Sequence, residues 1–152
     1  MHLRMATCED IGLLVSMRLS FVEADEKDTD YMLLKENCYS YFKRAFSDHA
    51  CDVVLAEENG RCVGTGIVFY YDSVPSTFNV TGKNAYITSL YVEPEYRCNG
   101  IGTEIIAKIV EKVLERKYKI IMLNASEMGK PLYEKLGFIE TKNSMILDMR
   151  NG

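Results

Sequence analysis

The stretch Ala85–Thr103, AYITSLYVEPEYRCNGIGT, joins an apolar run, a turn at Pro94 and a glycine-containing loop in immediate succession. The apolar run over residues 85–92 predicts a β-strand that is covered on both faces. After Gly100, apolar residues recur at helical spacing and predict an amphipathic helix; they stand at positions 101, 105, 106, 109, 110, 113 and 114. A strand, a tight loop and a helix in this order present unpaired backbone N–H groups that can bind an anion. The other interpretation is a plain strand–helix turn in which glycine supplies positive φ angles, and the loop alone does not decide between the two.

The residues after this helix predict the second strand of a βαβ unit. Residues 118–123 form another apolar run, so we expect the strand at 85–92 and this one to be parallel with a right-handed crossover. A short helix is predicted over residues 129–136 and should end at Gly137. Residues 138–141 and 145–149 are predicted to be two closing strands.

The N-terminal part of the chain predicts one strand and two helices. Residues 2–6 alternate as a short strand, and Thr7 with Asp10 resembles a capping box at the start of the first helix. Thr29 or Asp30 can cap the second helix, whose recurring apolar and aromatic residues are interpreted as core. The acidic residues over 23–30 are interpreted as a solvated connection; the alternative is a negative rim that attracts an amine.

The middle of the chain predicts a β-hairpin. Residues 51–57 and 61–71 flank Asn59-Gly60, a pair that suits the positive φ angles of a tight hairpin turn. Gly64 and Gly66 indicate a bulge or a place where another group comes close. The loop over residues 72–84 is long enough to be a functional lid or rim, and the alternative is a mobile connection.

Composition places the chain among ordinary globular proteins. Its 152 residues favour one domain spanning 1–152, in the α/β class. A net charge of −4 gives no basic footprint for nucleic acid, and no apolar run is long enough to cross a membrane. Five cysteines, two histidines and no Cys-x-x-Cys argue against a disulfide framework or a metal site. Reduced thiols in a cytoplasmic protein are therefore expected.

Two motifs in register resemble one known superfamily. Arg97-x-x-Gly100-x-Gly102 is similar to the Arg/Gln-x-x-Gly-x-Gly/Ala signature of the GNAT (GCN5-related N-acetyltransferase) superfamily, and Leu132–Phe138, LYEKLGF, is similar to its second motif. The predicted order of elements is also that of the superfamily. The resemblance implies a central, mixed, mostly antiparallel twisted sheet of six to seven strands with a splayed parallel pair, flanked by four helices.

The resemblance also implies acetyl-CoA as co-substrate and a primary amine as acceptor. The strand end at Leu90, Tyr91 and Val92 would pair with the pantetheine arm, and an N–H near Leu90 would stabilise an oxyanion. The signature residues and the loop N–H groups would hold the pyrophosphate; these are Arg97, Cys98, Asn99, Gly100, Ile101, Gly102 and Thr103. Cys98 as a nucleophile is the alternative to a backbone role. Asn124 and Ser126 lie where the superfamily often has an asparagine that reaches the pantetheine, and Ser126 can instead cap the short helix.

Tyr133 matches the tyrosine that protonates the leaving thiolate. No carboxylate matches a general base, so a water on Thr88 or Ser89, a distant Glu23 or Glu93, and proton loss to bulk water stay open. Glu23, Tyr71 and Ser89 are the candidate acceptor-site residues. A catalytically silent acyl-CoA-binding module and a longer acyl donor are the alternatives, and a homodimer is a further possibility taken from the superfamily.

Overall fold

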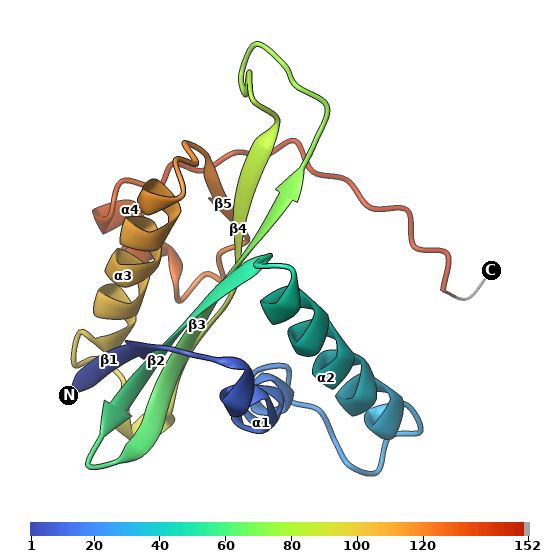
Figure 1. Cartoon of the computed structure of the whole chain (residues 1–152), viewed down its shortest axis with the longest axis vertical. Coiled ribbons are helices and arrows are strands. Elements are labelled where there is room, and N and C mark those ends of the chain that lie inside the picture. Colours follow the sequence, from blue (N-terminus) through green and yellow to red (C-terminus); the bar gives the residue numbers. More distant parts are fainter. Residues whose placement is uncertain (151–152) are drawn as a thin grey trace.

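The computed structural model describes residues 1–150, which form one sheet with helices on both faces (Figure 1). The strands lie in the order in which they occur in the chain: β1 (His2–Met5), β2 (Cys51–Glu58), β3 (Arg61–Asp72), β4 (Lys83–Val92) and β5 (Ile121–Leu123). Neighbouring strands are antiparallel except β4 and β5, which are parallel. The parallel pair is the one predicted from the βαβ pattern, because helix α3 makes the crossover between its strands.

Two pairs of helices cover the two faces. Helices α1 (Ile11–Phe21) and α2 (Tyr31–Ser47) pack on one face, and α3 (Ile101–Glu115) and α4 (Lys130–Lys135) lie on the other (Figure 1). Short 3-10 turns, η1 (Cys8–Asp10) and η2 (Pro94–Tyr96), precede α1 and the loop before α3. In the part of the chain that the structure describes, no helix is both long enough and apolar enough to cross a membrane.

Each face buries its own apolar cluster, because alternate residues of the central strands point in opposite directions. Val54, Val68 and Ile87 join α3 on one face, whereas Val53, Leu55 and Ile67 join α1 and α2 on the other. Helix α3 carries the most regular apolar stripe, and its Ile105, Ile106 and Ile109 are fully buried. The predicted amphipathic helix is therefore confirmed, and its apolar face fixes α3 against β2, β3 and β4.

The local predictions for the hairpin and the first cap are confirmed. Asn59 and Gly60 have φ angles of 53° and 77°, as a tight turn between twisted strands requires. Thr7 and Asp10 form the reciprocal capping box. Gly66 marks a close approach, because a Cβ at this position would lie 2.4 Å from Cγ2 of Ile105. The glycine therefore lets α3 pack directly on β3.

The predicted sheet of six to seven strands is wrong in number, because the described sheet has five. Residues 138–141 and 145–149 form no strand, and β5 is shorter than the predicted run over 118–123. The side chains of Ile139, Met145 and Ile146 are 85–97% exposed. Apolar residues show that a segment can be a strand, but a strand forms only where it pairs with a neighbouring strand. In this structure residues 138–150 follow α4 and run past the sheet toward the C-terminal end without forming a strand (Figure 1).

Candidate active site

An opening in the sheet lies where β4 continues beyond its parallel partner. β5 pairs with β4 only from Ala85 to Ile87, whereas β4 runs on to Val92. Five residues of β4, numbers 88–92, therefore have no neighbour on the β5 side in the described sheet. Their backbone polar groups on that side are available to a ligand, apart from the Val92 carbonyl oxygen, which accepts a hydrogen bond from Arg97.

A bulge at Thr88 decides which N–H groups face this opening. In the pairing with β3, Val68 lies opposite Ile87 and Ile67 opposite Ser89, so Thr88 is an extra residue. Before the bulge, Ala85 N donates to the carbonyl of Ile120 on the β5 side (3.2 Å); after it, Glu93 N donates to Val63 on the β3 side (2.9 Å). Because N–H groups alternate along a strand, those of Leu90 and Val92 point into the opening. These are the two residues that were predicted to contribute their backbone groups there.

The loop between β4 and α3 has the conformation of an anion-binding turn. Cys98 and Gly100 both have left-handed backbones, with φ angles of 64° and 81°, and α3 begins at Ile101. Alternation of left- and right-handed residues turns successive N–H groups toward one concavity. The N–H groups of Ile101, Gly102 and Thr103 belong to the first helical turn and have no intrahelical acceptor. Sequence reasoning therefore identified a segment whose backbone suits an anion.

Side chains of this segment hold the loop to the end of β4. The Nε of Arg97 donates to the carbonyl oxygen of Val92 (2.7 Å), and its guanidinium lies over the Tyr91 ring, 5.8 Å from the centroid. The side chain of Asn99 donates to the carbonyl of Tyr96 (3.3 Å). Cys98 is exposed, and its left-handed backbone is strained for a residue that has a side chain. Arg97 thus orders the loop through a strand carbonyl.

Tyr133 lies on α4, on the face of the sheet that carries α3. Its ring packs edge-on against Phe138, with the centroids 5.7 Å apart, and one ring carbon would lie 3.2 Å from a Cβ at Gly129. Partial burial raises the pKa of the Tyr133 hydroxyl above its ordinary value. The phenol is therefore protonated at neutral pH and can donate a proton.

The two predicted residues after β5 have different surroundings. Ser126 Oγ accepts a hydrogen bond from Gly129 N (3.1 Å) in the turn that precedes α4, whereas the N-cap of α4 is Gly129, which makes no side-chain cap hydrogen bond. Asn124 follows β5 directly and is exposed. No side chain contact of Asn124 fixes its direction, so its role stays a prediction.

A cavity of about 330 Å³ lies on the opposite face of β4, between that strand, β3 and the first two helices. Its lining is largely apolar and aromatic and includes Arg18, Asn37, Cys38, Tyr41, Phe42, Ile67, Phe69, Thr88 and Ser89. Nη1 of Arg18 donates to Ser89 Oγ (2.6 Å), and the carbonyl oxygen of Thr88 lies 3.5 Å from the same nitrogen. The cavity therefore reaches β4 at the Thr88 bulge and at Ser89, the residue before Leu90.

The three candidate acceptor-site residues lie in different places. Ser89 lines this cavity, but Glu23 and Tyr71 do not. Glu23 is an exposed residue with a φ angle of 54° after α1, and the Tyr71 ring packs on Phe69, which does line the cavity. Glu93, a candidate distant base, forms an ion pair with Arg61.

Arg18 was not among the residues predicted from sequence, although its neighbours in the sequence indicate that it is unusual. The residues around it, Val15, Met17 and Leu19, are apolar and buried, and Arg18 is the one charged residue in α1. A lone arginine within a buried helix needs a polar partner or a ligand, because burying a charge without one is costly.

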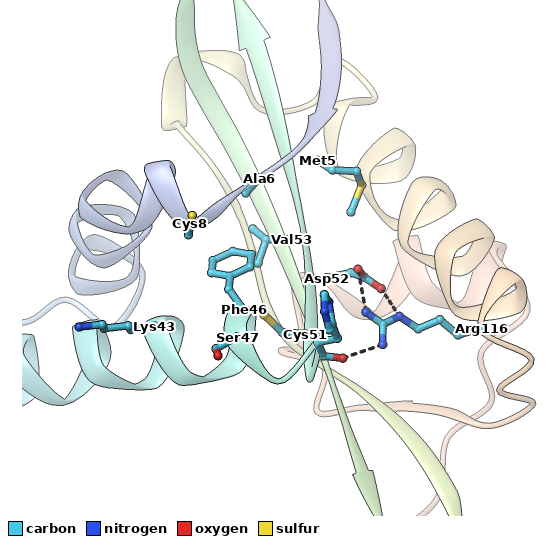
Figure 2. Close-up of a pocket in the computed structure, with 11 residues that line it drawn as sticks. Met5, Ala6, Cys8, Lys43, Phe46, Ser47, Cys51, Asp52, Val53 and Arg116 are labelled. Atoms are coloured by element: carbon cyan, nitrogen blue, oxygen red, sulfur yellow. Dashed lines mark hydrogen bonds and ion pairs between the residues drawn. The ribbon is translucent and has the colours of Figure 1, made fainter.

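A second cavity, of about 470 Å³, lies away from β4 (Figure 2). Its walls come from β1, β2 and the C-terminal ends of α2 and α3, and an arginine again marks it. Here Arg116 forms two hydrogen bonds with the Asp52 carboxylate (2.9 and 3.2 Å) and donates to the carbonyl of His49 (2.7 Å). Tyr70 also donates to Asp52 (2.6 Å), so this charge network is satisfied within the protein.

Comparison with known proteins is consistent with the fold and the loop. Residues 17–138 match the Acetyltransferase (GNAT) family. A crystal structure of a predicted acetyltransferase with acetyl-CoA from Clostridium acetobutylicum superposes with a TM-score of 0.87. That protein is 33% identical to this one, and the match covers 97% of this chain and 96% of the other.

Curated relatives differ in the acceptors that their names state. Thialysine N-epsilon-acetyltransferase of Sus scrofa is 36% identical over 85 residues, which cover 53% of this chain and 47% of that protein. Glucosamine 6-phosphate N-acetyltransferase of Trypanosoma brucei brucei is 29% identical over 97 residues, 64% of each chain. The matched part thus spans about half the length of the first of these relatives. The family match over residues 17–138 and the similarity to the clostridial structure show that this chain belongs to the GNAT acetyltransferase family.

Proposed function

We propose that the protein transfers an acetyl group from acetyl-CoA to a primary amine by direct attack of the amine. The observation that carries this proposal is the free edge of β4, where the N–H groups of Leu90 and Val92 face the opening and lead to the loop before α3. One continuous backbone surface can thus bind both a pantetheine amide and a pyrophosphate. When bound, acetyl-CoA supplies an activated acetyl thioester.

The residues fit acetyl-CoA on backbone geometry. The N–H groups from Cys98 to Thr103 bind the pyrophosphate, with the dipole of α3 adding to the attraction for negative charge. A Cβ at Gly102 would lie 3.2 Å from Leu132 and 3.5 Å from Leu90, so glycine keeps this part of the site open between α3, α4 and β4. Leu90 and Val92 pair with the pantetheine arm as an added strand would.

Two groups serve the chemical step. The N–H of Leu90 stabilises the negative charge that develops on the acyl oxygen, an effect worth about 3 kcal/mol for one well-placed donor. Tyr133 donates a proton to the departing thiolate. Its raised pKa suits an acid, since the phenol stays protonated over the whole neutral range.

The acceptor enters from the other face, through the cavity beside Ser89. No carboxylate lines this cavity, and the Ser89 hydroxyl already accepts from Arg18. The ammonium group of a bound amine therefore loses its proton to water, and the cavity selects the acceptor by shape and charge. The predicted base near Glu23 or Glu93 is not part of this proposal, because neither residue lines the cavity.

The test is release of free CoA thiol from acetyl-CoA across a panel of amines, with thermal unfolding measured in parallel with and without CoA. We expect turnover with at least one amine and a rise in melting temperature with CoA. A rise without turnover on any amine would favour the acyl-CoA-binding module that the sequence left as the alternative. The absence of any rise would contradict the proposed CoA site.

Three predictions from sequence stay proposals. A cytoplasmic location is checked by fractionation, and a homodimer by light scattering on purified protein. The length of the acyl donor is checked by comparing acetyl-, propionyl- and butyryl-CoA as donors in the same thiol assay. For the homodimer, a monomer at all concentrations up to 100-fold above the assay concentration would be the contradicting result.

A further inference from the structure

We propose that Arg18 binds an anionic group, a carboxylate or a phosphate, on the amine acceptor. This inference rests on the proposed function, since it assigns the acceptor class of the same site. The acceptor is then a small molecule that carries both an amine and an oxyanion. This differs from the cationic acceptor that the acidic residues 23–30 suggested.

The first argument is the charge balance around Arg18. Among the described residues, no carboxylate lies within ion-pair distance of its guanidinium, whereas Arg4 and Arg116 are both held by acidic side chains. Arg18 is partly buried beside Cys38, Tyr41 and Phe42. A partly buried cation that has no carboxylate partner gains more from an incoming anion than an exposed arginine does.

The second argument is that the guanidinium is already oriented. One of its nitrogens, Nη1, contacts Ser89 Oγ at 2.6 Å and the Thr88 carbonyl at 3.5 Å, and the group lies over the Phe21 ring at 5.1 Å. A guanidinium has five N–H donors, and most of them remain for a ligand. A fixed planar guanidinium matches the two oxygens of a carboxylate or phosphate and loses little entropy on binding them.

The third argument is the cavity itself. Its volume of about 330 Å³ is near the lower end of small-molecule sites, which suits a metabolite more than a folded protein surface. Arg18 is the one charged residue in its lining, and Asn37 and the Tyr41 hydroxyl are further polar groups on the helices. Residues 23–30 do not line it. The potential inside the cavity is therefore set by one positive charge.

The fourth argument is its position relative to the reacting atoms. Arg18 holds Ser89 and Thr88, and the N–H of the next residue, Leu90, faces the opening. An anion on Arg18 is thus anchored beside the point at which the proposed transfer occurs. Because the guanidinium repels an ammonium group, the amine of the acceptor is turned away from Arg18 and toward the opening.

The test compares matched amines that differ only in an anionic group. L-lysine is paired with cadaverine, which lacks the carboxylate, and glucosamine 6-phosphate with glucosamine, which lacks the phosphate. Each is measured by thiol release for kcat/KM and by calorimetric binding in the presence of CoA. Wild-type protein is compared with Arg18→Gln, Arg18→Lys and Lys43→Gln; Lys43 lines the other cavity and controls for net charge.

We expect the anionic member of at least one pair to be preferred by about 10- to 100-fold, the range for a charge-assisted pair of hydrogen bonds. Arg18→Gln should abolish that preference, Arg18→Lys should keep part of it, and Lys43→Gln should keep all of it. The pair that responds tells whether the anion is a carboxylate or a phosphate. The measured quantity is the ratio of kcat/KM between the two amines of a pair. A general displacement of the β4 bulge by the substitution affects both amines and therefore cancels in this ratio.

Three outcomes would overturn the inference: no preference in wild-type protein, a preference that survives in Arg18→Gln, or a loss that Lys43→Gln reproduces. Failure of the proposed function looks different, since CoA then raises the melting temperature but no amine is acetylated. Binding of the paired amines in the presence of CoA still tests Arg18 in that case.

Discussion

Two arginines each line one of the two cavities described above, and their surroundings differ in one decisive respect. Arg116 has a full set of partners: the Asp52 carboxylate, the His49 carbonyl and the Tyr70 ring, 4.2 Å away. Arg18 has a serine hydroxyl and a carbonyl oxygen, and no carboxylate among the described residues. A satisfied charge stabilises a fold, whereas an unsatisfied one in a cavity is available to a ligand. We therefore expect the larger cavity to be structural, and we expect the smaller one, beside β4, to hold the acceptor of the proposed reaction.

The largest effect that separates the two regions is expected at Tyr133, across β4 from the smaller cavity. Tyr133→Phe removes the acid but keeps the ring packed on Phe138, so kcat should fall by about 100-fold with the Kd for CoA unchanged. Single-turnover and steady-state thiol release measure this. Near-full turnover with a good acceptor amine would exclude Tyr133 as the acid.

A loss of stability without a loss of chemistry is expected at the larger cavity. Asp52→Asn leaves Arg116 without its counter-ion and should lower the free energy of unfolding by about 2 kcal/mol, measured by urea titration. The kcat/KM of the folded protein should stay within a factor of two. A large fall in kcat/KM at full folding would assign a functional role to this cavity and would break the distinction between the two arginines.

A smaller effect is expected in the loop before α3. Gly100→Ala places a side chain on a backbone with φ of 81°, and Gly60→Ala does the same at 77° in the hairpin turn. Neither Cβ would meet another atom within 4 Å, so both substitutions should cost about 1–2 kcal/mol of stability from the backbone alone. Only Gly100→Ala should weaken CoA binding, by about tenfold in calorimetry. Equal Kd values in the two variants would remove the loop from the CoA site.

The smallest effect is the one expected from ionisation of Tyr133 in the pH profile. The acid function of Tyr133 is present below its pKa and is lost as the pH rises through it, and burial moves that pKa above the ordinary value of about 10. With an alkylamine acceptor, kcat/KM should rise with pH from 6 to 9 as the amine deprotonates, and no fall from Tyr133 should occur below about pH 10. A decline between pH 7 and 9 that Tyr133→Phe abolishes would contradict this assignment.

The proposed cofactor side of the site could be inferred from the sequence because the proposed role depends on local backbone geometry. A buried strand, a loop with Gly100 and Gly102, and an amphipathic helix lie within one continuous segment, and Tyr133 is in a second recognisable motif. Of the proposed acceptor side, only Ser89 was among the candidates from sequence, because Arg18, Tyr41, Phe69 and Ser89 come from four elements that are far apart in the chain. No local pattern specifies that such residues meet.

The prediction of two closing strands, over residues 138–141 and 145–149, was wrong for a related reason. Residues 138–141 and 145–149 are rich in apolar residues, yet most of these side chains are exposed. Strand formation requires hydrogen bonds to a neighbouring strand, and the segment itself does not specify whether it will pair. The Asn59-Gly60 turn shows the opposite case, because its conformation depends on the two residues and their immediate neighbours.

The sequence by itself determined the elements of the βαβ unit, the hairpin turn, the helical faces and the family resemblance, because each is encoded by residues close together in the chain. Only the tertiary structure decided where β4 separates from β5, that a bulge at Thr88 turns the N–H groups of Leu90 and Val92 outward, and that Arg18 reaches Ser89 without a carboxylate partner. These features arise from the pairing and packing of distant segments, which set the position and charge of each group in space.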